Sequence, residues 1–395
     1  MDNHQHNIII VGSGLVGMTL ALMLSRQQYK VLILDKSSKK ELLEVKDLRT
    51  SAISQGSSRI LKEISIWNKI KNKAQPINEI YVSEGINSNE LDFKSETLNE
   101  GPLGYIVDNT YLKKIVFKEV LKSNFVKFVG GVNIKDIKST SGSATIFSNR
   151  GNFNAPLIVG ADGRNSKTRF FANIKSFFYD YNQVAFVFNI SHTLSHHSKA
   201  LERFFTSGPL ALLPMQNNNK KSSSVVWTVD SQLKEKLLKN KNFRKEFEKK
   251  YAEAFGQITK ISKPTVYNLN VVSCYEYFKK RVALVGDACQ AIHPIAGQGL
   301  NLGLRDSYHL AKIISESLEL GLDIGSRFVL KDYTNKRLID KKLLIQATHR
   351  LNQLFSNNSI VIKAIRENGL KIFNKSSFLK KQSMMFAMGL MKFDF

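Results

Sequence analysis

The residues with the clearest capacity for chemistry lie in the segment GDACQAIHPIAGQGLNLGLRD, from Gly286 to Asp306. Asp287 follows the apolar run RVALV, which predicts a buried strand, and the leucines after Gly299 predict a helix. Ligands of open parallel sheets bind where a strand ends and a helix begins, because the first helical amides point at the ligand. We therefore expect a ligand site that includes Asp287 and the glycine pair Gly297 and Gly299.

A second glycine-rich segment, GSGLVG, places Gly12, Gly14 and Gly17 in GxGxxG spacing. It follows the β-branched run Ile8–Val11 and opens a helix of small apolar residues, and the next apolar strand ends at Asp35. In a dinucleotide-binding βαβ unit these glycines permit the turn, the approach of a pyrophosphate and close helix packing, and the acid binds a ribose hydroxyl group. An acid there favours FAD or NAD over NADP.

The third segment, GADGRNSKTR, has Asp162 between Gly160 and Gly163 after another apolar run. The carboxylate could fix the amides of this loop or bind a ligand, and an ordinary Asp-Gly turn is an equally good interpretation. Both interpretations stay open.

In the first segment, Pro294 holds the chain where a flat ring could lie, and the positive end of the following helix would stabilise negative charge on a reduced flavin. A nicotinamide carries no such charge, so we interpret the segment as a flavin site. His293 could act as a general base, since an unperturbed imidazole titrates near pH ~6.5. A structural role that fixes the loop is the favoured alternative.

The whole chain suits a cytoplasmic α/β enzyme. Its 395 residues are enough for about two domains, and 43% hydrophobic content excludes disorder. Two cysteines, Cys274 and Cys289, cannot form a disulfide framework, and no spacing indicates a metal site. No window approaches the ~18–20 apolar residues of a membrane-spanning helix.

The net charge of +25 could indicate nucleic acid or an anionic membrane, or only a biased composition. The segment from Lys234 to Lys250 is predicted to form one amphipathic helix, with Leu233, Leu237, Phe243 and Phe247 near one face. No nucleic-acid-binding motif is recognisable, so we expect no nucleic-acid partner.

Further elements follow from periodicity. Residues 46–61 predict a loop into a helix, residues 77–106 alternating strands, and residues 108–122 a helix capped by Asp108 or Asn109. Residues 177–272 carry short strands around the basic helix, and the chain after Asp306 is expected to be mostly helical.

Together the three motifs resemble those of the class A FAD-dependent aromatic hydroxylases, of the para-hydroxybenzoate hydroxylase fold. HPIAGQGLNLGLRD, with Gln290 and His293, is most similar to the ubiquinone-biosynthesis hydroxylases (UbiH, UbiI and UbiF). DLRTSAIS around Arg49 and LGYIVDNTYL from Leu103 also resemble that subgroup, and the resemblance runs from about Ile8 to Lys342. Gln290 and Cys289 depart from the wider superfamily, where His and Ala are usual.

The resemblance implies a GR2-type Rossmann-like FAD-binding domain, an interleaved mixed β-sheet substrate domain and a helical C-terminus. The FAD-binding domain would comprise residues 1–76, 108–176 and 273–342, with the last part holding the GD motif. Residues 77–107 and 177–272 would form the substrate domain. Residues 343–395 would form C-terminal helices.

The resemblance also implies roles for individual positions. The positions that would bind the pyrophosphate are Gly12, Gly14, Leu15, Val16 and Gly17. Asp35 and Lys36 would lie at the adenosine ribose. Arg49 would reach the pyrophosphate or the ribityl chain, Asp162 and Gly163 would lie in a loop shared with NAD(P)H functions, and Asp287 would bind the ribityl chain. Those around the isoalloxazine are Pro294, Gly297, Gln298, Gly299, Leu300 and Asn301. The positions expected to serve catalysis are His293, Pro294 and Gln298.

The implied reaction uses NADH or NADPH to reduce FAD, and O2 then forms a flavin C4a-hydroperoxide that hydroxylates an activated ring. The implied substrate is a polyprenyl phenol of ubiquinone biosynthesis. Two alternatives remain: a related hydroxylase of another aromatic or isoprenoid compound, and a non-catalytic flavoprotein subunit of a biosynthetic complex. The ring carbon that receives oxygen cannot be deduced from the motifs.

The C-terminal segment FLKKQSMMFAMGLMKFDF, from Phe378 to Phe395, is rich in Met and Phe behind Lys380 and Lys381. It is too short to span a bilayer but could lie in the interface on the inner face of the membrane. Docking on the protein's own core or on a partner of a ubiquinone-biosynthesis complex is equally consistent with the pattern.

Overall fold

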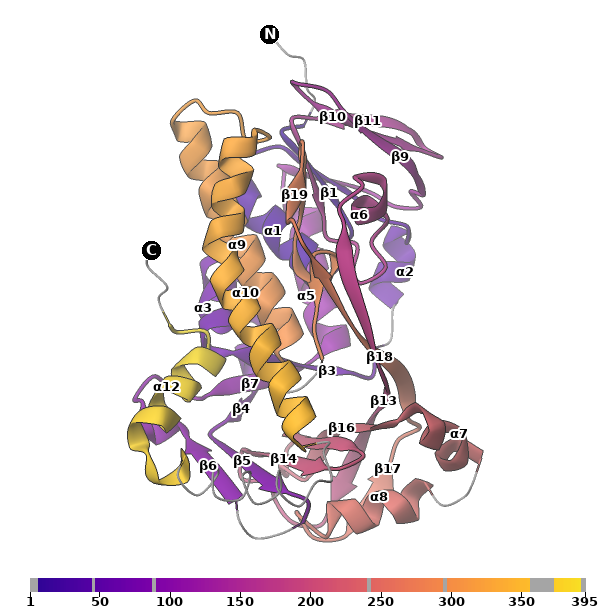
Figure 1. Ribbon diagram of the computed structural model, residues 1–395, viewed down its shortest axis with the longest axis vertical. Coiled ribbons are helices and arrows are strands. Elements are labelled where there is room, and N and C mark those ends of the chain that lie inside the picture. Colours follow the sequence, from indigo (N-terminus) through magenta and orange to yellow (C-terminus); the bar gives the residue numbers. More distant parts are fainter. Residues whose placement is uncertain are drawn as a thin grey trace.

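The computed structural model describes residues 6–44, 47–86, 90–239, 243–293, 297–355 and 373–391. In these residues, strands and helices alternate through the N-terminal part, and long helices follow residue 297 (Figure 1). The expected α/β fold with a helical C-terminus is confirmed.

A mostly parallel sheet contains the predicted βαβ unit. Its order in the described chain is β19-β20-β12-β1-β2-β8, and β1 pairs in parallel with β2 and β12. Ile8 and Ile10 of β1 face a helix-covered core, whereas Ile9 and Val11 face a small antiparallel sheet. Both faces are covered, which explains the uninterrupted apolar run. The strands of the parallel sheet are β1 (Ile8–Val11), β2 (Val31–Leu34), β8 (Val126–Val129), β12 (Leu157–Gly160), β19 (Phe278–Lys279) and β20 (Val282–Leu284), and those of the small sheet are β9 (Ile134–Ser139), β10 (Ala144–Ser148) and β11 (Gly151–Ala155).

Short helices surround this sheet, and one predicted boundary is confirmed. The helix at residues 109–122 begins with Asp108 as its N-cap, whose Oδ1 accepts a hydrogen bond from the Tyr111 amide at 2.7 Å. The helices are α1 (Leu15–Arg26), α2 (Lys39–Glu44), α3 (Gln55–Glu63), α4 (Trp67–Ile70), α5 (Asn109–Lys122) and α6 (Lys167–Phe171).

The segment predicted as a loop into a helix at residues 46–61 contains a strand that sequence reasoning missed. This strand pairs with a later one, and Ser54 then caps α3 through its side chain. The pairing partner that stabilises these residues as a strand lies 50 to 58 residues away. The strands of this connecting sheet are β3 (Thr50–Ser54), β4 (Gln75–Ile77) and β7 (Gly104–Asp108).

A large, mostly antiparallel sheet forms the other half of the molecule, at the bottom of Figure 1. Its order in the described residues is β21-β18-β13-β16-β15-β14-β5-β6, with β17 also paired to β13. One face packs through Phe186, Phe188 and Trp227 against two helices, and the other faces a cavity. The division into FAD-binding and substrate segments stays a prediction. The strands are β5 (Glu79–Glu84), β6 (Glu90–Lys94), β13 (Ser176–His192), β14 (Lys199–Phe205), β15 (Gly208–Pro214), β16 (Ser222–Asp230), β17 (Ile258–Ile261), β18 (Thr265–Cys274) and β21 (Gln290–Ala291).

The basic segment is helical on both sides of residues 240–242, which lie outside the described chain, in α7 (Ser231–Lys239) and α8 (Phe243–Tyr251). Leu237 and Phe247 are buried as expected, but Leu233 is 37% exposed. Leu233 therefore does not share the burial of Leu237 and Phe247.

Helices α9 (Gln298–Glu319) and α10 (Arg327–Phe355) lie side by side along the parallel sheet, and α12 (Ser377–Ala387) lies against β6 and β7 (Figure 1). Within the described ranges, no helix is both long and apolar enough to span a bilayer. In the C-terminal segment, Met384 and Met388 are buried against Leu103, while Phe378 is 67% exposed. Residues 392–395 lie outside the described chain.

Candidate active site

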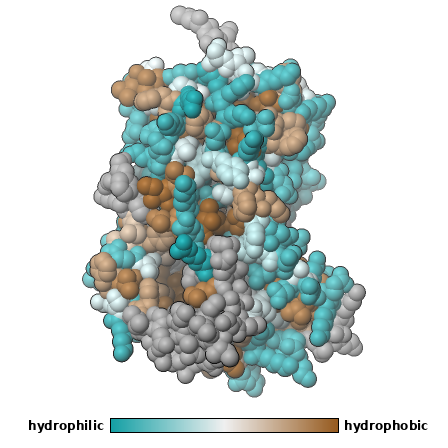
Figure 2. All heavy atoms as spheres, viewed as in Figure 1, coloured by the Kyte–Doolittle hydropathy of each residue, from teal (hydrophilic) through white to brown (hydrophobic). Residues whose placement is uncertain are grey.

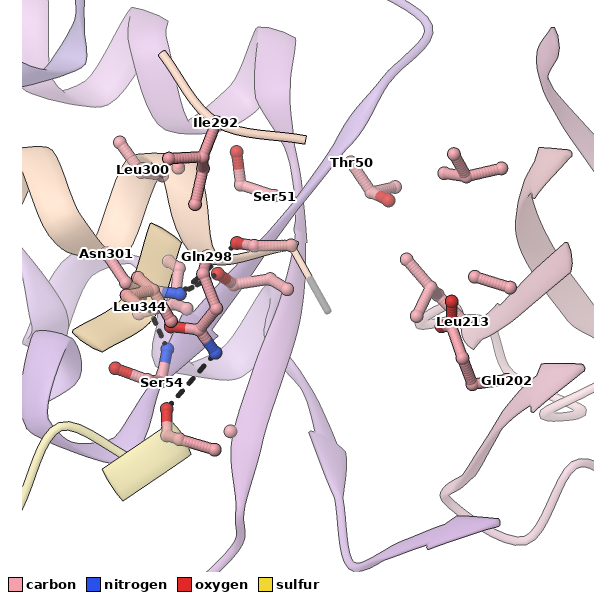
Figure 3. A pocket seen from close by; sticks show the side chains of 18 of the residues that line it. Thr50, Ser51, Ser54, Glu202, Leu213, Ile292, Gln298, Leu300, Asn301 and Leu344 are labelled. Atoms are coloured by element: carbon pink, nitrogen blue, oxygen red, sulfur yellow. Dashed lines mark hydrogen bonds between the residues drawn. The ribbon is translucent and has the colours of Figure 1, made fainter. Parts of the chain in front are cut away.

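A cavity of about 1620 Å³ lies where the parallel sheet, the large sheet and α12 meet. One part is lined by the turns after β1, β12 and β20 and by the start of α9, and another by apolar side chains of the large sheet and α12. Figure 3 shows Gln298 and Ile292 on one side of this space and Leu213 and Glu202 on the other. On the face shown in Figure 2, hydrophilic residues predominate and apolar ones gather towards the middle.

The first glycine turn has the geometry that its spacing predicts. Gly12 has φ +105°, and a Cβ there would lie 2.5 Å from the carbonyl oxygen of Ala161. A Cβ on Gly17 would lie 2.2 Å from the Gly12 oxygen, whereas one on Gly14 would meet nothing within 4 Å. Gly14, Leu15 and Val16 line the cavity, and no side chain caps the start of α1.

Asp35 follows β2 as expected, but its carboxylate is engaged with the turn itself. It accepts hydrogen bonds from the Ser13 amide at 2.6 Å, the Ser13 hydroxyl at 2.6 Å and the Ser37 amide at 2.7 Å. Asp35 and Lys36 do not line the large cavity. Asp35 thus fixes the glycine turn, and its role at a ribose stays a prediction.

Asp162 has the loop-fixing geometry that we considered beside a ligand role. Its carboxylate accepts hydrogen bonds from the Thr168 amide at 2.9 Å and the Thr168 hydroxyl at 3.0 Å, and from the Ser166 hydroxyl. The next residues, Gly163 and Arg164, line the cavity. The turn therefore contributes backbone and a guanidinium group to the site.

Arg49 directly precedes β3, lines the cavity and forms an ion pair with Asp47. Asp47 was not among the predicted site residues. The Nε of Arg49 lies 2.8 Å from Asp47 Oδ1, and Lys113 Nζ lies 2.9 Å from Asp47 Oδ2. Burial raises the pKa of Asp47, but the hydrogen bonds from Arg49 and Lys113 outweigh it and hold this pKa well below the ordinary value. Arg49 also lies 5.2 Å over the ring of Tyr267.

Asp287 lies in the short 3-10 turn Gly286–Ala288 that follows β20, and its side chain lines the cavity. Among the described residues, its carboxylate has no hydrogen-bond or ion-pair partner. Burial raises the pKa of Asp287, while Arg164 and Arg49 act to lower it. A half-buried carboxylate without a partner is poorly solvated, so this position suits a ligand that supplies hydroxyl donors.

The start of α9 is fixed to two other parts of the chain. Asn301 Oδ1 accepts a hydrogen bond from the Ser54 amide at 2.9 Å, and Gln298 Nε2 donates to the Ala387 oxygen of α12 at 3.2 Å. Gly297 has φ +61°, and no side chain caps the helix. The residues of this stretch that line the cavity are Gly297, Gln298, Gly299, Leu300 and Asn301.

His293 is buried and does not line the cavity. Its Nε2 lies 3.3 Å from Gln183 Oε1, and its ring lies edge-on to Tyr181 at 4.9 Å. Burial, with a smaller contribution from Arg164, lowers the pKa of His293 to about 4. A neutral, enclosed imidazole favours the structural alternative over a general base. Pro294 lies outside the described residues.

This lining fits FAD. The uncapped N-terminus of α1 beside the open space at Gly14 suits an anionic pyrophosphate. Asp287 offers an acceptor for polyol hydroxyl groups, and the uncapped N-terminus of α9 offers positive potential to an electron-rich ring.

Comparisons with known proteins agree with this fit. The family described as FAD binding domain matches residues 5–348. The chain is 33% identical to "Ubiquinone hydroxylase UbiL" of Rhodospirillum rubrum over 98% of this chain and 90% of that protein. It is 27% identical to the 3-demethoxyubiquinol 3-hydroxylase of Escherichia coli over 99% of this chain and all of that protein. The crystal structure of p-nitrophenol 4-monooxygenase PnpA from Pseudomonas putida DLL-E4 covers 96% of each chain at 16% identity and a TM-score of 0.81, so the two share a fold.

Proposed function

The chain belongs to the FAD binding domain family, and from that premise we propose that it hydroxylates the aromatic ring of a polyprenyl phenol in ubiquinone biosynthesis. It is an FAD-dependent monooxygenase that uses O2. NADH or NADPH is the proposed reductant.

One observation carries the proposal. A single cavity joins a flavin-type lining, with Gly14, Asp287 and the start of α9, to a long apolar lining. The apolar part includes Leu91, Phe93 and Leu103 as well as Met384 and Met388 of α12. A polyprenyl phenol matches this lining in both of its parts. Its ring must lie beside the flavin to react, and its apolar tail needs apolar walls. The names of the two relatives support the same substrate class.

The chain's own residues have distinct tasks in this reaction. The chemistry that FAD supplies when bound is electron transfer from the reductant and activation of O2. Asp287 would accept hydrogen bonds from ribityl hydroxyl groups. The N-terminus of α9 would stabilise negative charge on the reduced flavin ring. The apolar walls exclude water from the reacting groups.

We further propose that the outer face of α12 contacts the inner face of the cytoplasmic membrane. Phe378 and Leu379 are exposed there beside Lys381, and the buried face of the same helix lines the cavity. Such a position would let a lipid-soluble phenol enter from the bilayer. Replacing Phe378 and Leu379 by serine should reduce sedimentation with anionic vesicles. Unchanged sedimentation would leave partner docking as the role of this face.

The enzymatic proposal is tested on the purified full-length protein. Its visible spectrum should show bound flavin, and NADH or NADPH oxidation should accelerate on adding a prenylated phenol, with a product heavier by one oxygen atom. Bound flavin with stimulation only by other aromatic compounds would indicate a different substrate. Bound flavin without turnover on any aromatic compound would indicate a non-catalytic subunit.

A further inference from the structure

Glu202 is an acidic residue on the cavity wall that the sequence did not mark. It lies on β14, where side chains alternate between the two faces of the large sheet. Arg203, its neighbour in the chain, faces away and donates hydrogen bonds to the carbonyl oxygens of Lys250 and Tyr251. Ala200, Glu202 and Phe204 face the cavity. Because side chains alternate along the strand, the Glu202 carboxyl group points into the part of the cavity where the proposed substrate would bind.

The sheet around Glu202 offers its carboxyl group no partner. The residues opposite it on the adjacent strands are Val82 and Ala211, and those two positions away on its own strand are Ala200 and Phe204. Among the described residues, the side chain of Glu202 makes no ion pair or hydrogen bond. Enclosing a half-buried carboxyl group in an apolar wall costs folding free energy, so its position in a cavity points to ligand binding.

Among the described residues, the charged groups other than Glu202 that line the same cavity lie at the flavin-type end. Arg49 and Lys113 are held by Asp47, and Arg164 donates to Asn270 Oδ1 at 2.9 Å. Burial raises the pKa of Glu202 to about 7, with no neighbouring charge contributing. The carboxyl group therefore changes its charge near neutral pH in an apolar environment.

We propose that Glu202 accepts a hydrogen bond from the hydroxyl group on the substrate ring, and thereby fixes which ring carbon is presented to the flavin-type end of the cavity. The inference rests on the proposed function, because that function supplies a phenol. Figure 3 shows Glu202 across the cavity from Gln298, so a ring bound between them would be held from the sheet side. A polar group in an apolar wall discriminates strongly against a ligand that lacks the matching group. The polar atom of the protein is left unpaired when such a ligand binds.

The test compares two ligands and three forms of the protein. The ligands are a short-chain prenylated phenol and the same compound without its hydroxyl group, and their dissociation constants are measured from the perturbed flavin spectrum. Wild-type protein should prefer the phenol by about tenfold or more. Glu202→Gln, which keeps an acceptor oxygen without the charge, should show a smaller preference, and Glu202→Leu none.

A matched control uses another carboxyl group of the same sheet. Glu79 on β5 lies outside the cavity and is held by Tyr81 and Lys199. Glu79→Gln should keep the wild-type preference. A full flavin spectrum in each variant excludes misfolding as the cause of any loss.

Two pH measurements separate this role from a packing role. The preference of the wild type for the phenol should grow between about pH 6 and pH 8, as Glu202 ionises while a phenol near pKa ~10 stays protonated. Glu202→Leu should show no such growth. Because the folded-state pKa is raised, the carboxyl group should also make wild-type stability fall with rising pH from about 4.5 to about 7, and Glu202→Leu should lack this loss.

The outcomes distinguish the two proposals. If the wild type hydroxylates a prenylated phenol at one carbon and Glu202→Leu keeps both the ligand preference and that single product, the assignment of Glu202 is wrong and the proposed function stands. Additional ring positions hydroxylated by Glu202→Leu would support the assignment. If wild-type protein neither binds nor hydroxylates any phenol, both proposals fail.

Discussion

Two carboxyl groups, Asp287 and Glu202, line the cavity without a protein partner among the described residues. Burial raises the pKa of both, which means that folding places them where charge is poorly solvated. By contrast, Asp35, Asp47 and Asp162 accept hydrogen bonds from the chain itself. Carboxylates that are hydrogen-bonded to the chain position parts of the site. Asp287 and Glu202, by contrast, are available to hydroxyl groups of ligands.

Asp287→Ala should weaken FAD binding, because the ribityl hydroxyl groups lose a charge-assisted acceptor worth about 1.5–3 kcal/mol. This corresponds to a roughly tenfold to hundredfold higher dissociation constant, measured by titrating the apoprotein with FAD. Asp136→Asn, on the small sheet and outside the cavity lining, serves as the control and should bind as wild type. Full FAD affinity in Asp287→Ala would refute the placement of this residue.

At the scale of elements, a buried ionic cluster connects α9, α10 and the turn that carries Asp287. Asp306 lies 2.7 Å from Arg337 and 2.9 Å from Lys341, and it accepts a hydrogen bond from the Gly286 amide at 3.0 Å. These charged side chains are at most 2% exposed. The cluster therefore holds the GD turn at a defined position against the two helices.

Removing one member of this cluster leaves buried charges without a partner. Asp306→Ala should lower the free energy of unfolding by about 3–5 kcal/mol, measured by urea denaturation. Glu316→Ala on the same helix breaks only the exposed pair with Lys312 and should cost less than about 1 kcal/mol. Equal stability of the two variants would show that the cluster does not support the turn.

At the scale of the whole molecule, the cavity is assembled from segments far apart in the sequence. Helix α12 forms part of its wall: Met384 and Met388 are buried, Gln298 donates to Ala387, and Lys380 Nζ lies 2.7 Å from Asp92 on β6. The C-terminal segment thus docks on the protein's own core with one face and exposes Phe378 on the other.

Disturbing this apolar wall should admit more water to the cavity. Met384→Glu should raise the fraction of NAD(P)H oxidised without ring hydroxylation, seen as hydrogen peroxide released per reductant consumed. Ser377→Glu adds the same charge at the exposed start of α12 and should leave this ratio unchanged. A wild-type ratio in Met384→Glu would mean that α12 does not exclude water.

The sequence by itself determined the local parts of this protein. Glycine spacing and short-range apolar patterns established the βαβ unit, the turn at Asp287 and the helix starting near Gln298, because each depends on residues within about one turn or strand. The same motifs identified the family. Even the loop-fixing role of Asp162 was among the alternatives, since its partners lie within six residues.

Tertiary structure alone decided what depends on distant pairing. Strand β3 pairs with β7, whose residues lie 50 or more positions further along the chain. Glu202 is indistinguishable in sequence from a surface glutamate, because the alternation of Ala200, Glu202 and Phe204 does not say which face of β14 is covered. The neighbouring strands and α12 make that face a cavity, and only their packing turns an ordinary acid into a candidate substrate ligand.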